Sequence, residues 1–299
     1  MKLLSQAERQ TDRLKILFVT PALILLIGMN VFPLIYNIAL SFTSAELSGG
    51  DWTFVGSANY NRIFSEPRYS GAIRTTALFV LLAVSIELAI GFLLALSLRK
   101  AFHGKSVLVT LLLVPMMLSP AVMGLYWNLV LNGQYGILNQ LLSWIGFSQP
   151  QWLTDPDLKL LSILAVDVWM WTPFMTLILL AGLQAIPGYL YEAAAIDRAS
   201  PWTVFRRITL PLCAPLIFLA ALFRATDALK QFDVVMAITG PNDSATQTLS
   251  ALLYQVMFRD DKIGIGSAYA FVVLVPVIAL ATVFIRFVDA SRRRQGRPG

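Results

Sequence analysis

The chain has 299 residues, of which 57% are apolar and 13% are charged, and its net charge is +6. A soluble domain carries about 25% charged residues, so this composition excludes an ordinary soluble protein and indicates a chain embedded in a membrane. No basic run alternates with aromatic residues, which excludes a nucleic-acid-binding surface. The single cysteine, Cys213, and the single histidine, His103, exclude an internal disulfide, a thiolate metal cluster and a multi-histidine metal site.

Six stretches of the sequence are long and apolar enough to cross a bilayer, for which about 20 residues are needed. They are residues 16–41, 75–98, 106–131, 158–186, 212–238 and 267–288. Each is expected to be a helix because lipid offers no partner for an open backbone. The first is too long for the core of a signal peptide, so we expect it to be retained. The prediction is an all-α polytopic membrane protein with one transmembrane domain, 16–288, between a polar segment 1–15 and a tail 289–299.

Proline residues interrupt several of these stretches, and a proline inside a membrane helix usually produces a kink. Pro115 and Pro120 enclose the strongest predicted break, which lies in the third stretch. We therefore expect the third span to bend or break between these two residues.

Lysine and arginine residues are unequally divided between the two sides of this predicted topology. The side with both termini and segment 187–211 holds fourteen, whereas the other side holds six together with eight acidic residues. Positive residues are enriched in cytoplasmic connections, so both termini and segment 187–211 are predicted to be cytoplasmic. An even number of spans agrees with this orientation.

Segment 187–211 is polar and patterned, although a connection between two membrane helices needs no such pattern. The sequence predicts one short helix from Gly188 to Asp197 and a second with Ser200 as its N-cap and Pro201 in its first turn. Small residues in the first helix suit close docking by another protein. The same pattern also suits an amphipathic loop that rests on lipid, and spacing alone leaves both interpretations open.

The same segment resembles the EAA loop of ABC importer permeases, whose pattern is Glu-Ala-Ala, three residues, Gly, nine residues, Ile, one residue and Leu-Pro. The residues that agree with this pattern or with common choices in it are Glu192, Ala193, Ala194, Asp197, Ile208, Leu210 and Pro211. Arg198 replaces the family glycine, and a residue other than glycine costs about 1 kcal/mol if a left-handed turn is required there. Together with Arg198, these residues form the predicted ATPase-coupling loop.

The resemblance extends over nearly the whole chain and is closest to carbohydrate importers similar to the maltose and glycerol-phosphate systems. The supporting segments are Tyr60, Trp171–Phe174, Phe223–Asp233 and Thr239–Pro241. The resemblance implies a permease of the bacterial inner membrane, a transport subunit rather than an enzyme, with no cofactor or metal on this chain. It implies a heterodimer with a second permease chain and two copies of a cytoplasmic ATPase that binds ATP and Mg. An extracytoplasmic binding protein would deliver a sugar, a sugar derivative or a polyol.

Polar residues in the fourth and fifth spans are the candidates for a translocation pathway, because charges at membrane depth usually face a cavity or a partner. They are Asp167, Trp169, Trp171, Arg224, Asp227, Lys230, Gln231 and Asp233. A carboxylate beside tryptophan can hold a sugar through hydrogen bonds at its edge and stacking on its face. The alternative is a structural salt bridge between helices, with the tryptophans facing lipid or a neighbouring helix.

Two other functional classes would place different demands on the sequence. A secondary transporter would use Asp167, Arg224, Asp227 and Lys230 as ion sites, but such proteins often have paired inverted halves, which this sequence lacks. A membrane enzyme would need a convergent nucleophile, base or metal set, and none is present in the sequence. The Gly104–Ser106 segment imitates a phosphate-binding loop, but Arg99 stands where the loop needs its first glycine.

Overall fold

The computed structural model describes residues 17–294, and its regular elements are helices apart from an isolated antiparallel bridge between Thr43 and Phe54. Five helices are long and apolar enough to cross a membrane. They are Leu17–Ser41, Pro67–Leu98, Pro156–Gln184, Pro201–Ala228 and Ile263–Ala290. The predicted all-α membrane architecture is confirmed. The predicted polar segment 1–15 lies outside the described residues.

The described chain divides into two compact units. The first comprises residues up to Ser65 together with Val256–Val272, and the second comprises Glu66–Gln255 together with the residues after Val273. The long helix α14, Ile263–Arg294, begins in the first unit and continues into the second. It extends to Arg294, beyond the expected end of the sixth span near residue 288, and residues 295–299 lie outside the described part.

The first unit contains the span Leu17–Ser41, which includes η1 (Ile27–Val31) and α2 (Phe32–Ser41), and the short helix α3 (Ala58–Ser65). The Tyr60 hydroxyl donates to Ser41 Oγ at 2.9 Å, and the Asn59 amide donates to the Ser41 and Thr43 carbonyls at 2.9 Å each. These bonds hold α3 against the end of α2. Most side chains of the first span are exposed within this chain, as expected for a helix that lipid or another chain covers.

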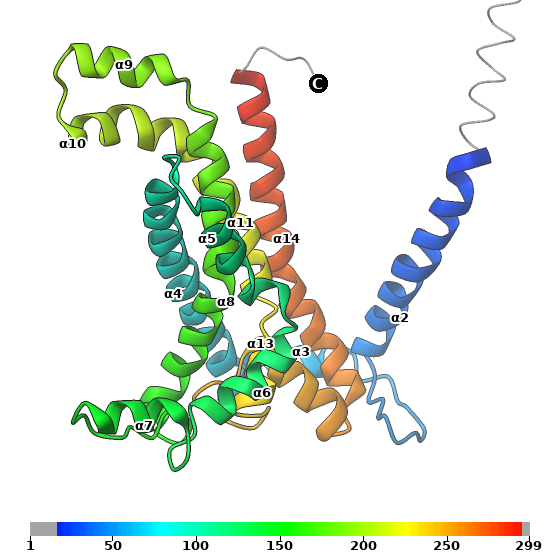
Figure 1. Cartoon of the computed structure of the whole chain (residues 1–299). Helices are drawn as coiled ribbons and strands as arrows, with labels where there is room; N and C mark the ends of the chain where they lie inside the picture. Colours follow the sequence, from blue (N-terminus) through cyan, green and yellow to red (C-terminus); the bar gives the residue numbers. More distant parts are fainter. Residues whose placement is uncertain (1–16, 295–299) are drawn as a thin grey trace, which may run out of the picture. The chain divides into compact units, whose positions relative to one another are not determined.

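The second unit is built on α4 (Pro67–Leu98) and α8 (Pro156–Gln184), which pack side by side, with α11 (Leu210–Ala228) against both (Figure 1). Lipid tails are as apolar as leucine, so close packing rather than removal from water must hold such helices together. Gly91 of α4 provides this closeness, because a Cβ there would lie 2.7 Å from Met175 Cβ of α8. A larger residue at position 91 would separate the two helices.

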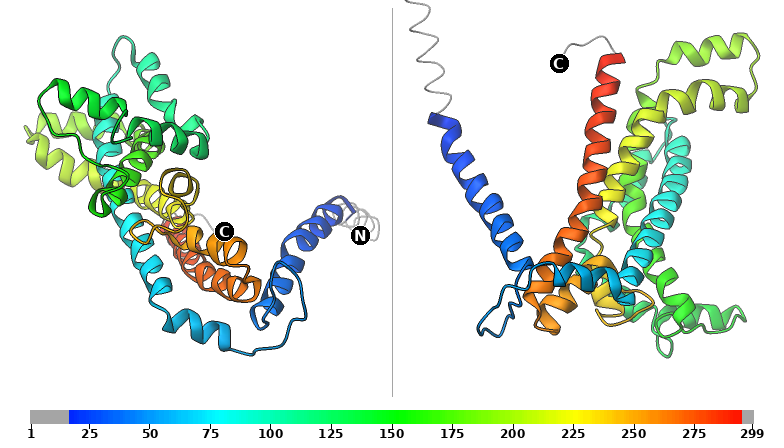
Figure 2. Two further views of the ribbon diagram at one scale, coloured as in Figure 1. Left: turned by 90° about the horizontal axis from the view of Figure 1, so that it is seen from below. Right: turned by 180° about the vertical axis from the view of Figure 1, so that it is seen from behind.

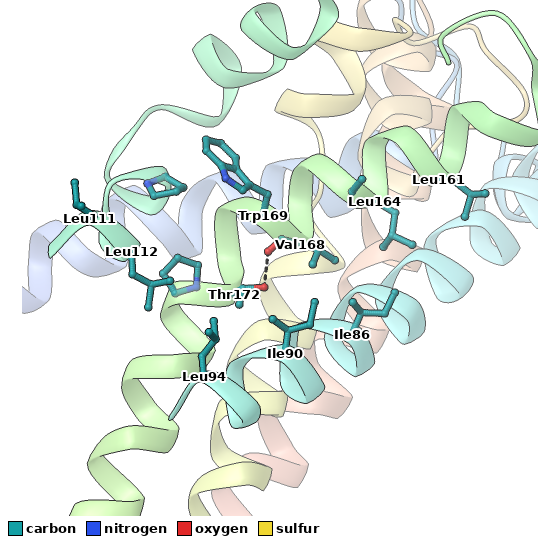
Figure 3. Close-up of a pocket in the computed structure, with 13 residues that line it drawn as sticks. Ile86, Ile90, Leu94, Leu111, Leu112, Leu161, Leu164, Val168, Trp169 and Thr172 are labelled. Carbon is teal, nitrogen blue, oxygen red and sulfur yellow. Dashed lines mark hydrogen bonds between the residues drawn. The ribbon is translucent and has the colours of Figure 1, made fainter. Parts of the chain in front are cut away.

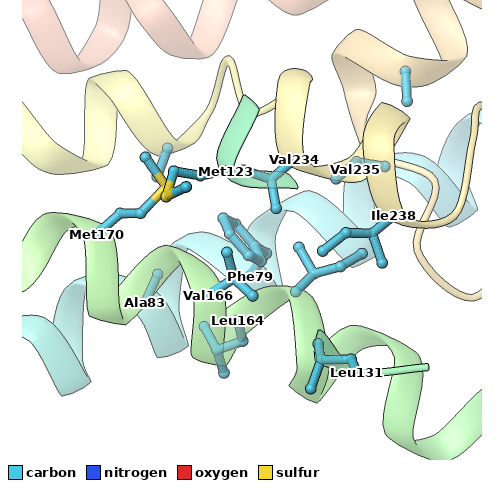
Figure 4. Close-up of a cluster of buried hydrophobic side chains, with 13 residues drawn as sticks. Phe79, Ala83, Met123, Leu131, Leu164, Val166, Met170, Val234, Val235 and Ile238 are labelled. Carbon is cyan, nitrogen blue, oxygen red and sulfur yellow. The ribbon is translucent and has the colours of Figure 1, made fainter. Parts of the chain in front are cut away.

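Two clusters of buried apolar side chains fill the second unit. One contains Phe79, Met123, Met170 and Val235, among others, and joins α4 and α8 to α6 (Pro120–Val130) and α12 (Asp233–Ile238) (Figure 4). The other contains Leu98, Met175, Leu183 and Cys213 and joins α4, α8 and α11 toward the end that carries segment 187–211. The second cluster therefore forms the base on which that segment rests.

The third predicted span is not one continuous helix. It consists of α5 (Lys105–Leu113), the short 3-10 turn η2 (Pro115–Met117) and α6 (Pro120–Val130). Leu118 and Ser119 between them are extended, with ψ of 150° and 129°. Proline lacks an N–H and disfavours helical geometry in the residue before it, which explains a break at the predicted place.

The fifth predicted span, 212–238, is also interrupted, contrary to the single helix we expected. The helix α11 ends at Ala228, and a short α12 (Asp233–Ile238) follows after a turn. The turn accepts a hydrogen bond from outside it, because the Thr248 hydroxyl donates to the Gln231 carbonyl at 2.8 Å. Inside the turn, the Phe232 N–H donates to Gln231 Oε1 at 3.1 Å. These side-chain bonds replace the helical backbone bonds, which the sequence pattern alone did not indicate.

Short helical elements lie at both ends of α8. At one end, α9 (Gly188–Ile196) and α10 (Pro201–Val204) form a helical hairpin that returns through η3 (Phe205–Thr209) into α11 (Figures 1 and 2). At the other end lies α7 (Ile137–Trp144), which runs across the direction of α8. The remaining short helix of the unit, α13 (Leu249–Tyr254), packs on α4.

Candidate functional site

The turn between α9 and α10 is a left-handed helix end. Arg198 has φ of 55°, and its N–H donates to the Ala195 carbonyl, while the Ala199 N–H donates to the Ala194 carbonyl at 2.9 Å. These two bonds form a Schellman motif, in which the left-handed residue is usually glycine. Ser200 then caps α10 by accepting from the Thr203 N–H at 3.2 Å. The left-handed turn that the family glycine would allow is present, and Arg198 adopts it.

The predicted coupling residues divide between two faces of this hairpin. Glu192, Ala193 and Asp197 are exposed, whereas Ala194 is only 8% exposed and packs inside the chain. Of the two alanines in the Glu-Ala-Ala pattern, Ala193 alone presents its side chain at the surface. At the far end of the segment, Ile208 packs against the buried cluster, while Leu210 and Pro211 are exposed.

Sequence reasoning missed three large apolar residues on the surface of this hairpin. Tyr189, Ile196 and Trp202 are 65%, 82% and 66% exposed. Tyr189 and Ile196 lie three residues before and four residues after Glu192, so all three share one face of α9. The helical spacing of Tyr189 and Ile196 around Glu192 is the signal that could have revealed these two residues. The exposed face is a mixed apolar and acidic surface suited to a protein partner.

A buried group of charges joins the three long helices of the second unit. The Arg224 guanidinium of α11 contacts Glu87 of α4 at 2.8 Å, Asp167 of α8, and Asp227 of its own helix at 3.2 Å. Arg224, Glu87 and Asp167 are at most 2% exposed, while the Asp227 side chain is 52% exposed. Glu87 of the second span is therefore an interhelical partner of Arg224.

Asp167 does not face open space, because Arg224 and the Gln231 amide surround it. The Gln231 Nε2 donates to Asp167 Oδ1 at 2.6 Å. The arginine also lies over the Trp171 ring, with Cζ 5.1 Å from the ring centroid. Asp167 thus positions Arg224 and Gln231, and a solute in the neighbouring cavity would meet those two side chains first.

Six of the eight candidate pathway residues line one small polar cavity of about 90 Å³. They are Trp171, Arg224, Asp227, Lys230, Gln231 and Asp233, and Phe232 and Pro120 complete the lining. Pro120 begins α6 directly after the break in the third span, Gln231 and Phe232 lie in the break of the fifth, and Asp233 begins α12. The two interrupted helices therefore meet at this cavity, the polar cavity.

Trp169 lies apart from the polar cavity. It lines a larger apolar pocket of about 680 Å³ between α4, α5 and α8, with Ile90, Leu112 and Val168 among its neighbours (Figure 3). The hydroxyl of Thr172 in this pocket is satisfied, because it donates to the Val168 carbonyl at 2.6 Å. Trp169 also packs against Trp127, with ring centroids 5.4 Å apart. It is therefore poorly placed to stack on a solute held by Asp167.

No group of three or more histidine, cysteine, aspartate or glutamate residues within positions 17–294 has the arrangement of a metal site. Glu87 and Asp167 are two buried carboxylates that lie close together, but both form ion pairs with Arg224. The chemistry available at the polar cavity is hydrogen bonding from charged and amide groups beside an aromatic face. This arrangement suits binding of a hydroxylated solute better than bond-breaking chemistry.

Residues 87–297 match the family described as the inner membrane component of binding-protein-dependent transport systems. The chain belongs to this family. It is a multi-pass inner-membrane permease subunit of a binding-protein-dependent ABC importer of the carbohydrate-uptake type, and is not itself catalytic. The matched region includes Glu87, the polar cavity and the whole of the coupling loop.

Two relatives illustrate the similarity. The trehalose/maltose transport system permease protein MalF of Thermococcus litoralis is 34% identical over 95% of this chain and 96% of its own length. The trehalose transport system permease protein SugA of Mycobacterium tuberculosis is 32% identical over 93% of this chain and 90% of its own length. The fold is shared with the crystal structure of a bacterial alginate ABC transporter, with a TM-score of 0.82 and 21% identity over the full length of both chains.

Proposed function

We propose that this permease carries a sugar, a sugar derivative or a polyol across the inner membrane, using energy that a separate cytoplasmic ATPase delivers to the α9–α10 hairpin. The observation that carries this proposal is the hairpin itself. Its Schellman turn at Arg198 presents Glu192, Ala193 and the exposed Ile196 on one face. A loop lying passively on lipid would not need an acidic residue at the centre of that face.

The proposed topology has six crossings, with both termini and the hairpin in the cytoplasm. Five crossings are the long helices, and α5, η2 and α6 together form the sixth despite their break. Protein packing supports this assignment, because α6 packs closely on α12 and leaves no room for a Cβ at Gly124, which would lie 2.6 Å from Ala237 Cβ. Non-helical backbone at membrane depth is tolerated where protein buries it or where it lines a cavity.

The solute is proposed to pass the polar cavity. Its lining offers donors on Lys230 and Gln231, acceptors on Asp227 and Asp233, and the Trp171 ring, which together match the edges and faces of a polyhydroxylated molecule. The names of the relatives, trehalose/maltose and trehalose permeases, support a sugar. A cavity of about 90 Å³ is smaller than a disaccharide, so passage requires the helices around it to move apart.

The proposed assembly contains a second permease chain, two copies of the ATPase, and an extracytoplasmic binding protein that delivers the solute. ATP and Mg would bind on the ATPase, and no cofactor is proposed for this chain. The second permease would cover helix faces that are exposed here, such as Leu17–Ser41, and would complete the pathway.

The proposal is tested by purifying this chain from native membranes in mild detergent and identifying every retained protein by mass spectrometry. Retention of an ATPase and a second permease supports the importer assembly and identifies the operon whose binding protein should be tested with sugars. A homodimer or monomer that transports solute after reconstitution alone would refute it. That result would favour a secondary transporter, with Asp227 as the first residue to neutralise.

A further inference from the structure

A cation–π contact joins the coupling hairpin to a helix that is not its neighbour in the chain. Arg99 follows the last residue of α4, and its Cζ lies 3.7 Å from the centroid of the Tyr191 ring on α9. Guanidinium groups within about 6 Å of an aromatic centroid are attracted by the negative face of the ring. The hairpin is connected covalently to α8 and α11, on which α4 packs, and this contact adds a direct route from α9 to α4.

Tyr191 also joins the hairpin to the start of α11. Its hydroxyl forms a hydrogen bond of 3.2 Å with Thr209 Oγ1, and Thr209 is only 3% exposed. Tyr191 and Ala194, three residues apart, form the inward face of α9, while Glu192 between them points outward. The Tyr191 side chain thus connects α9 to Arg99 at the end of α4 through its ring, and to Thr209 just before α11 through its hydroxyl.

The Arg99–Tyr191 stack lies beside a cluster of buried side chains that contains a thiol. Tyr191 packs against the cluster that contains Leu98 and Cys213, and Cys213 is 0% exposed. Cys213 is the single cysteine of the sequence, so labelling of this chain, separated from its partners by gel electrophoresis, reports on this site alone. A second contact, between Phe92 of α4 and Phe205 of η3 at a centroid distance of 5.9 Å, holds the neighbouring turn and does not involve α9.

We propose that the Arg99–Tyr191 stack is the link that transmits movement of the coupling hairpin to α4, so that both residues are positioning residues for transport. The inference rests on the proposed function, because it takes the ATPase to act on α9. The physical reason is that the guanidinium is attracted to the face of the ring, while Arg99 is only partly buried and can remain hydrated on its outer side. Because α4 carries Glu87, movement of α4 reaches the buried charges beside the polar cavity.

Four variants distinguish the contributions of the Tyr191 ring, the Tyr191 hydroxyl and the Arg99 charge. Arg99→Gln removes the cation and Tyr191→Leu removes the ring, whereas Arg99→Lys keeps a cation and Tyr191→Phe keeps the ring without the hydroxyl. In the full complex purified with its ATPase, hydrogen exchange is measured by mass spectrometry in α9 and in the last turn of α4, with and without a non-hydrolysable ATP analogue. Cys213 modification by a fluorescent maleimide is measured in parallel.

The wild-type complex is expected to change its exchange in both α9 and α4 when the nucleotide analogue is added. Arg99→Gln and Tyr191→Leu are expected to keep the change in α9 and lose the change in α4, whereas Arg99→Lys and Tyr191→Phe keep both. Without nucleotide, the first two variants should raise the rate of Cys213 modification by roughly three- to thirty-fold, which corresponds to the usual strength of a cation–π contact.

Three results would overturn the proposal. The first is a wild-type response of α4 in both Arg99→Gln and Tyr191→Leu. The second is a loss of the α4 response in Tyr191→Phe as large as in Tyr191→Leu, which would assign the effect to the Thr209 hydrogen bond. The third is unchanged hydrogen exchange in α9 of the wild-type complex when the nucleotide analogue is added. That result would refute the proposed function itself, and it is distinct because it is seen in the wild type without any substitution. If Arg99→Gln is unstable in detergent, the comparison of Tyr191→Leu with Tyr191→Phe decides the question.

Discussion

Arg224 Nε of α11 lies 2.8 Å from Glu87 Oε2 of α4, and neither side chain is more than 2% exposed. The contact is an ion pair without the alignment of a hydrogen bond, because neither of these atoms has a hydrogen-bond partner within the described structure. The same guanidinium binds Asp167 of α8. One cation therefore compensates two buried carboxylates on two other helices, and its loss would leave both of them without a counter-charge.

We expect Arg224→Met to destabilise the protein by about 3–5 kcal/mol, the usual cost of leaving a buried partner uncompensated. Glu87→Gln should cost less, because it removes one carboxylate and leaves Arg224 paired with Asp167. Thermal unfolding in detergent, followed by the reaction of buried Cys213 with a maleimide dye, measures the difference. Equal midpoints for Arg224→Met and the wild type would show that the cluster contributes nothing to stability.

Glu192→Lys should abolish association with the ATPase while leaving membrane insertion intact. Glu192 is exposed on α9 beside Ala193, so reversing its charge disturbs the partner surface and no contact inside this chain. Co-purification of the ATPase, together with the amount of permease in the membrane fraction, checks both parts. Asp289→Lys, at an exposed acidic residue outside the coupling loop, is a control for general charge reversal. Normal transport by Glu192→Lys would refute the coupling role of Glu192.

Arg198→Gly should be neutral or stabilise the hairpin by up to about 1 kcal/mol. Arg198 already has a positive φ of 55°, and glycine adopts this conformation without a Cβ penalty. Arg198→Val should destabilise the hairpin, because a β-branched residue fits that conformation worst. Thermal stability of the three proteins gives the order Gly, Arg, Val. A loss of ATPase binding in a stable Arg198→Gly protein would instead show that the arginine side chain itself contacts the partner.

Gly91→Val should separate α4 from α8. A Cβ at position 91 would lie 2.7 Å from Met175 Cβ and 3.1 Å from the Thr176 backbone nitrogen, and backbone cannot move aside as a side chain can. Overpacking of this kind typically costs about 1–3 kcal/mol. Gly188→Val, at a glycine with open space around it, is the matched control. Unfolding midpoints should fall for position 91 and change little for position 188.

The loop 43–57 should loosen at acid pH through Asp261. Hydrogen bonds from the Ser48 hydroxyl and the Ser48 backbone amide, the latter 2.9 Å from Oδ1, lower the pKa of Asp261 below its ordinary value of 3.8. Since the folded pKa is lowered, this tie stabilises the loop above pH 3.8 and is lost as the pH falls through the folded pKa.

Pepsin, which is active in acid, can detect this change, with mass spectrometry locating the cuts. In the wild type, cleavage within 43–57 should begin below pH 3.8, whereas Asp261→Asn should be cut at higher pH without this threshold. Asp260→Asn, at the neighbouring position, controls for the loss of a charge. An identical pH profile in the wild type and in Asp261→Asn would contradict the assignment to Asp261.

Local properties of the sequence were sufficient for the helical membrane architecture and for the coupling hairpin. Apolar length alone predicts a helix where lipid cannot satisfy the backbone, and Pro115 and Pro120 predict a break because proline removes an N–H. Ser200 and Pro201 likewise act on the backbone next to them, so the start of the second helix was readable without knowing the fold, whereas the left-handed conformation of Arg198 came from the structure.

Contacts between distant segments decided the rest. The break at Gln231 depends on the Thr248 hydroxyl, and the burial of Asp167 depends on Arg224 57 residues away. Nothing in the spacing of Trp169 and Trp171 shows that one faces an apolar pocket and the other the polar cavity. The sequence by itself determined which segments are long and apolar enough to form membrane helices and where proline breaks one of them, because these are properties of neighbouring residues. Only the tertiary structure decided which charges neutralise one another, because that depends on which helices lie side by side.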